Sequence, residues 1–122
     1  MQYIDALVTI ETINFDNLVS FYTLLLKQEP QKIIPQVYAE FQISSLKLGI
    51  FKPKQSHEAE FANINKNPLS LCIEVSSLEN ALAHLQSFGY HHPVNITTAS
   101  HGREVYIYDP DGNRLILHQS KN

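Results

Sequence analysis

The sequence predicts an α+β fold in which one unit, strand–helix–three strands (βαβββ), occurs twice. The order of apolar patterns in the first half is repeated in the second, each half has one amphipathic stretch, and a hairpin signal closes the chain. The 122 residues, 43% hydrophobic and 17% charged, suit one domain with a buried core. We therefore expect a single domain at 1–122, with modules at about 1–53 and 69–122 and a connector at 54–68.

The first module begins with an alternating stretch at 6–12, which predicts a strand. A helix follows, and its apolar stripe consists of Phe15, Leu18, Val19, Tyr22, Leu25 and Leu26. Shorter runs predict three further strands, at 32–34, 37–43 and 46–51. The connector is polar and without periodicity, so we expect a linker or a flap there.

The second module repeats this order. Residues 69–75 predict a strand, and Ser76 with Glu79 forms a capping box for the helix that follows. The apolar stripe of that helix is Leu78, Ala81, Leu82, Leu85 and Phe88, and Gly89 suits the position after its end. A short strand is expected near 93–97, before the closing hairpin.

The closing hairpin consists of two alternating runs, 103–108 and 114–118, around Asp109-Pro-Asp-Gly-Asn113. Pro110 fixes φ near about −65°, and Gly112 tolerates a positive φ, as such turns require. A turn of this composition between two period-2 runs is a strong hairpin signal. Taken alone, these residues are equally compatible with an ordinary structural hairpin.

Composition argues against several classes of function. The net charge is −3 and no run of Lys or Arg is present, which disfavours binding to nucleic acid or to an anionic membrane. Cys72 is the single cysteine, so neither an internal disulfide nor a cysteine-rich metal site can form. The first residues lack the pattern of a signal peptide, and no stretch is long enough to span a bilayer. We therefore expect a soluble, cytoplasmic protein.

Three stretches carry a resemblance to a known family: Leu18–Tyr22, Leu71–Ala81 and Tyr108–Asn113. In these stretches the chain resembles the vicinal oxygen chelate superfamily, the group of glyoxalases, bleomycin resistance proteins and extradiol dioxygenases. The resemblance implies two βαβββ modules whose eight strands form an incomplete barrel around a cavity, with the two helices outside. It also implies a homodimer.

The sequence departs from that superfamily at the metal site. Metal-using members place His, Glu or Gln on the cavity face of four strands, and the matching positions here are Leu7, Gly49, Ser70 and Ile116. Leucine, glycine and isoleucine have no side-chain donor atom, and serine is a poor ligand for a divalent ion. We therefore expect no metal and no other cofactor.

The alternation also identifies the cavity face, because in every strand one set of alternate residues is nearly all apolar and must pack under the helices. A plain solvated sheet face would also be polar, but several aromatic residues favour a ligand cleft. Carboxylates outnumber cations on this face, which favours a cationic or flat aromatic ligand. The expected binding residues are Thr9, Glu11, Tyr38, Phe51, Ser70, Cys72, Glu74, Tyr106, Tyr108, Arg114 and His118.

A few side chains are candidates for chemistry. Glu11 and Glu74 occupy matching places in the two repeats and could act as an acid/base pair, although solvent-facing carboxylates are the favoured interpretation. His118 could serve as a base, and the loop residue His101 could contact a ligand. Cys72 has no neighbouring cation to lower its pKa, so a packing role is favoured over a nucleophile.

Together these observations predict a small-molecule binding or sequestering protein of the glyoxalase/bleomycin-resistance type, in preference to an enzyme. One alternative is an enzyme of the same superfamily, a lyase, isomerase or dioxygenase, that uses metal-free acid/base chemistry or relocated metal ligands. A second alternative is a structural or regulatory subunit whose cavity is filled by side chains. Fold resemblance alone cannot decide among these functions.

Overall fold

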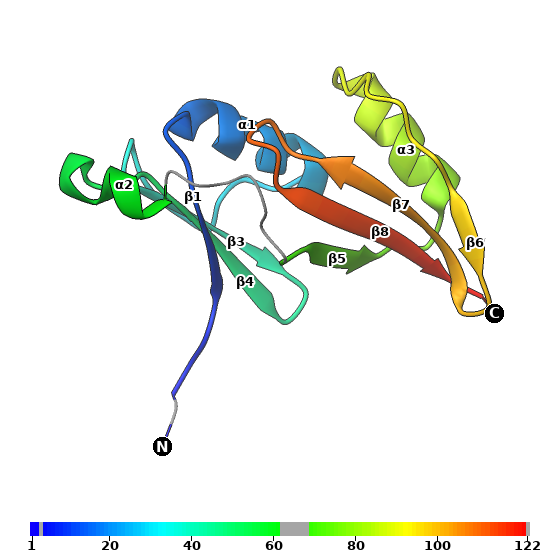
Figure 1. Ribbon diagram of the computed structural model, residues 1–122, viewed down its shortest axis with the longest axis horizontal. Helices are drawn as coiled ribbons and strands as arrows, with labels where there is room; N and C mark the ends of the chain where they lie inside the picture. The colour runs from blue at the N-terminus through cyan, green and yellow to red at the C-terminus, as the bar shows by residue number, and fades with distance from the viewer. Residues whose placement is uncertain (3, 62–68, 122) are drawn as a thin grey trace. The chain divides into compact units, whose positions relative to one another are not determined.

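The computed structural model describes residues 1–2, 4–61 and 69–121 (Figure 1). The chain forms two compact units, Met1–Lys66 and Asn67–Asn122. The first unit contains β1 (Val8–Glu11), α1 (Phe15–Leu26), β2 (Lys32–Ile34), β3 (Tyr38–Ile43), β4 (Leu46–Phe51), a 3₁₀ helix (Gln55–His57) and α2 (Glu58–Phe61). The second unit contains β5 (Leu71–Glu74), α3 (Leu78–Ser87), β6 (Thr97–Ala99), β7 (Gly102–Tyr108) and β8 (Arg114–Ser120).

The two units have the same topology. Their four-stranded sheets have the orders β1-β4-β3-β2 and β5-β8-β7-β6. In each sheet the first strand pairs in parallel with the last strand, and the other pairs are antiparallel. The predicted α+β fold of two βαβββ modules is therefore confirmed.

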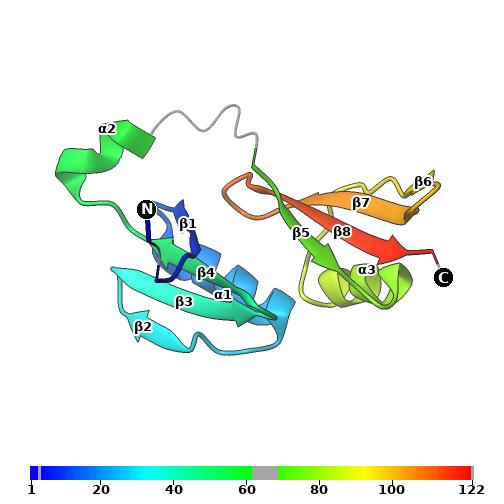
Figure 2. The same cartoon turned by 90° about the horizontal axis from the view of Figure 1, so that it is seen from below.

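The core of the first unit lies between its sheet and α1, which covers one face of the sheet (Figure 2). The helix contributes Leu18 and Tyr22, and the sheet contributes one set of alternate residues. That set is almost inaccessible to solvent and consists of Ala39, Phe41, Leu48 and Ile50. The apolar set predicted to pack under the helix is confirmed on these two strands.

The second unit repeats this packing with Leu78 and Leu85 of α3 over the sheet residues Val105, Ile107, Leu115 and Leu117. The helix ends as predicted, because Gly89 has φ +104 and the N–H of Tyr90 donates to the Leu85 carbonyl over 3.0 Å.

The predicted capping box at the start of α3 is wrong by one residue. Ser77 is the cap, and its hydroxyl accepts a hydrogen bond from the Asn80 N–H. The Glu79 carboxylate forms a two-bond ion pair with Arg103 on β7, at 2.5 and 3.0 Å, and its backbone hydrogen bond is to its own N–H.

The first strand of each module is less buried than its alternation predicts. Val8 is 39% exposed, and Leu71 and Ile73 are half-buried. The physical reason is that β1 and β5 are edge strands of their own sheets, so each has a neighbouring strand on one side only.

Two sequence-based expectations need correction. Part of the connector is helical, since residues 55–61 form the 3₁₀ helix and α2, while residues 62–68 lie outside the described chain. The strand expected at 93–97 is instead Thr97–Ala99, because it pairs with the start of β7 through Thr97 and Glu104. In the described part of the chain, no helix is long and apolar enough to cross a membrane.

Candidate functional site

The sheet of the second unit brings the binding residues predicted for the second module onto one face. Because the first and last strands pair in parallel, residues far apart in the sequence form rows across β5, β8 and β7. Strand register defines two complete rows, Cys72–Ile116–Tyr106 and Glu74–His118–Glu104. In the third row, Ser70–Arg114–Tyr108, register pairs Arg114 with Tyr108, and a side-chain hydrogen bond joins Arg114 to Ser70.

The row Ser70–Arg114–Tyr108 holds Arg114 in a defined position. Its Nε donates to the Ser70 hydroxyl over 2.6 Å, and its guanidinium carbon lies 6.0 Å from the centre of the Tyr106 ring. Tyr106 and Tyr108 are 50% and 44% exposed, because they lie on the face of β7 opposite the buried residues Val105 and Ile107. This end of the face therefore presents a fixed cation beside two accessible aromatic rings.

The opposite end carries a hydrogen-bonded chain of three titratable side chains. The Nδ1 of His118 lies 2.6 Å from the Glu74 carboxylate, and its Nε2 lies 2.8 Å from the Nδ1 of His101. In the tautomer with the proton on Nδ1, His118 donates to the Glu74 carboxylate, and its Nε2 accepts a bond from His101. The sequence placed His101 in a turn, but its pairing with His118 depends on the β6–β7 turn and was missed.

The carboxylate of Glu74 is held in its ionised form. Hydrogen bonds from Ser120 and His118 lower the pKa of Glu74 to about 2. The stability that these bonds provide is complete above the ordinary pKa of 4.5 and is lost as the pH falls toward 2. We predict that carbon-13 NMR will find the midpoint of the Glu74 carboxyl near 2 and that His118→Gln will raise it. A wild-type midpoint at or above 4.5 would contradict this reading.

Cys72 lies in the middle row and is exposed. Partial burial of the thiol and the negative charges of Glu104 and Glu74 raise the pKa of Cys72. A raised pKa opposes formation of the thiolate, which is the nucleophilic form of cysteine.

The first unit carries the remaining predicted residues on the corresponding face. Its rows across β1, β4 and β3 are Thr9–Gly49–Glu40 and Glu11–Phe51–Tyr38. Glu11 pairs with Phe51 as Glu74 pairs with His118, so the two glutamates hold matching register positions in their units.

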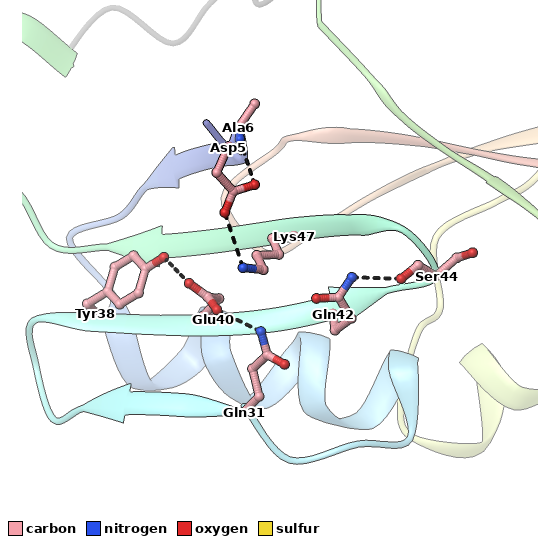
Figure 3. A network of polar contacts seen from close by, with 8 residues as sticks. All are labelled: Asp5, Ala6, Gln31, Tyr38, Glu40, Gln42, Ser44 and Lys47. Atoms are coloured by element: carbon pink, nitrogen blue, oxygen red, sulfur yellow. Dashed lines mark hydrogen bonds and ion pairs between the residues drawn. The ribbon is translucent and has the colours of Figure 1, made fainter. Parts of the chain in front are cut away.

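Glu40 belongs to the first of these rows but is not among the predicted binding residues, and it is the centre of a polar network (Figure 3). It is only 8% exposed; its carboxylate accepts bonds from the Tyr38 hydroxyl over 2.9 Å and from Gln31 Nε2 over 2.6 Å. These two bonds lower the pKa of Glu40, while burial and the bond to Glu40 raise the pKa of Tyr38 to about 12. The network therefore joins an ionised carboxylate to a neutral phenol.

The ring of Tyr38 occupies the space above Gly49. A Cβ at Gly49 would lie 2.8 Å from the Tyr38 hydroxyl oxygen and 3.0 Å from its ring, so the ring would have to move. We predict that Gly49→Ala lowers the free energy of unfolding by about 1–2 kcal/mol, measured by chemical denaturation. In a Tyr38→Ala background the loss should disappear, and an equal loss in both backgrounds would contradict this explanation.

The residues at the positions expected to match the superfamily's metal ligands do not fit a divalent ion. Leu7, Gly49 and Ile116 offer no donor atom, and Gly49 is covered by Tyr38. The hydroxyl of Ser70 already accepts a bond from Arg114, whose positive charge would repel a cation. Within residues 1–2, 4–61 and 69–121, no group of three or more His, Cys, Asp or Glu side chains could hold a metal.

Comparison with solved structures defines the class of fold: that of the glyoxalase and bleomycin resistance proteins. A glyoxalase/bleomycin resistance protein from Catenulispora acidiphila matches with a TM-score of 0.72 and 18% identity, over 98% of this chain and 100% of that one. The bleomycin resistance determinant encoded on transposon Tn5 matches at 0.71 and 18%, over 98% and 100%. Lactoylglutathione lyase from Agrobacterium tumefaciens matches at 0.70 and 18%, over 97% and 96%.

These structures have the fold that the sequence resemblance implies, and at 18% identity they show the fold alone. No protein-family model and no curated protein matches the sequence.

Proposed function

We propose that this protein binds or sequesters a small molecule with a flat aromatic part, as a metal-independent member of the glyoxalase/bleomycin-resistance group. The observation that carries the proposal is the pair of accessible tyrosines on one sheet face, Tyr106 and Tyr108. Exposed aromatic rings next to a few positioned polar groups are typical of ligand sites. The carboxylates of Glu74 and Glu104, at the other end of that face, favour a ligand that also has a cationic group.

The remaining features of the proposal come from the sequence and from its resemblance to the superfamily. The chain acts as a single domain of two modules, as a cytoplasmic homodimer, and without a cofactor. The absence of donor atoms at Leu7, Gly49 and Ile116 supports metal independence. Metal analysis of the purified protein should find only substoichiometric zinc, iron and manganese. A stoichiometric ion held by protein atoms at these positions would overturn metal independence.

Binding itself is tested with a neutral flat probe, 2-naphthamide, by isothermal titration calorimetry and amide NMR. We expect saturable binding that shifts the signals of β7 and β8, and about a threefold to tenfold loss in Tyr106→Ala. The control is Ile33→Ala, because this exposed side chain lies on β2 of the first unit, outside the three rows. No saturable binding of any flat aromatic probe would refute the proposed function.

A second candidate function is metal-free acid/base catalysis, and the chain Glu74–His118–His101 favours it. A carboxylate that orients a histidine, which in turn contacts a second proton carrier, is a common arrangement for proton transfer. Formation of lactoylglutathione, assayed in the presence of a chelator, tests one such reaction. Turnover that is lost in His118→Gln would favour this function, and absence of turnover would leave binding as the supported role.

A further inference from the structure

We propose that the ligand of this face carries a carboxylate, and that Arg114 binds it while Tyr106 and Tyr108 contact the attached ring. This inference rests on the proposed function and specifies the chemistry of its ligand. It adds an anionic group to the ligand, whereas the excess of carboxylates over cations on this face predicts only a cationic group.

The guanidinium of Arg114 is positioned in advance. Its Nε donates to the hydroxyl of Ser70, which fixes the plane of the group, and the side chain is half-buried. Among the residues that the structure describes, no carboxylate forms an ion pair with Arg114. The two terminal nitrogens thus keep the paired N–H donors that match the two oxygens of a carboxylate.

Arg103, the other arginine of this sheet, has partners for its guanidinium within the same unit. Arg103 donates two bonds to Glu79 and one to Gln119, so its charge is balanced within the unit. A half-buried cation without such a partner is costly unless a counter-ion or solvent compensates it. The contrast identifies Arg114 as the cation that is available to an external anion.

The aromatic rings set the shape of the partner. Tyr108 lies directly across from Arg114 in the register of β7 and β8, and the ring of Tyr106 lies 6.0 Å from the guanidinium carbon. A planar ring on these tyrosines would place an attached carboxylate at Arg114. The nearest acidic row, at His118, is four residues farther along β8, or about 13 Å. At that spacing the acidic end could still hold a cationic group of the same ligand.

The test compares 2-naphthoate with 2-naphthamide, which has the same ring but no charge, by isothermal titration calorimetry. Wild-type protein should bind the acid about tenfold more tightly than the amide. Arg114→Gln should reduce the ratio of acid to amide affinity from about tenfold to about one, whereas Arg114→Lys should retain part of the preference. Arg103→Gln is the matched control and should keep the full preference, and thermal unfolding verifies that each variant is folded.

The outcomes separate the two proposals. If both probes bind wild type equally, or if Arg114→Gln keeps the preference, the carboxylate site is wrong and the aromatic binding function stands. If neither probe binds up to millimolar concentration, the proposed function fails and this inference fails with it. Ser70→Ala provides a second variant, because it removes the support of Arg114 without removing its charge and should reduce the preference for the acid.

Discussion

Replacing Gly102 by alanine is expected to lower the free energy of unfolding by about 3–5 kcal/mol, which combines backbone strain with overpacking. Gly102 has φ +146, a conformation that L side chains rarely adopt. A Cβ there would lie 2.2 Å from the main-chain carbonyl oxygen of Gln119, so relief requires β8 to move. Moving β8 would disturb its pairing with β7, in which Gly102 is opposite Ser120.

Gly112→Ala is the matched control for this prediction. Gly112 has φ +89, but a Cβ there would meet nothing within 4 Å, so only backbone strain is added. We expect a loss of about 1 kcal/mol for this variant. Chemical denaturation measures both values, and similar losses at the two glycines would show that the close approach to Gln119 is unimportant.

Phe41→Ala is expected to destabilise the protein by about 3–5 kcal/mol, because it removes a large side chain from a closed core. Phe41 is 0% exposed, and its ring centre lies 6.3 Å from that of Tyr22 on α1. The ring thus joins the central part of the first sheet to its helix. A cavity at this place cannot collapse without displacing its buried neighbours Tyr22 and Leu48.

The control for Phe41→Ala is Ile33→Ala on the edge strand β2, where the side chain is 51% exposed. Its expected cost is below about 1 kcal/mol, because little apolar area returns to water. Equilibrium denaturation monitored by circular dichroism compares the two. A loss at Phe41 no greater than at Ile33 would mean that the ring does not hold α1 on the sheet.

The structure departs from the sequence-based predictions mainly at the ends of elements. Alternation of polar and apolar residues identified the strands, because successive strand residues take opposite faces. It placed the sixth strand at 93–97, however, whereas β6 is Thr97–Ala99. The partner strand decides that boundary. Likewise Ser77 and not Ser76 is the helix cap, and Glu79 is paired with Arg103 on β7, which no local pattern reveals.

The candidate site was predictable in its composition and less so in its connections. The face that carries Tyr106, Arg114 and His118 follows from their spacing along two strands. The hydrogen bonds within the face do not follow from that spacing, and two features that depend on such bonds were not predicted. Glu40 is buried and bonded by Tyr38 and Gln31, and His101 from a turn completes the chain that begins at Glu74.

The sequence by itself determined the repeated strand and helix order and the face of each strand, because both are written in the local spacing of apolar residues. Only the tertiary structure decided which polar side chains meet. Ser70 and Arg114 are separated by 44 residues, as are Glu74 and His118, yet each pair is hydrogen-bonded across β5 and β8. Parallel pairing of strands that far apart is fixed by packing of the whole module, and local periodicity does not encode its register.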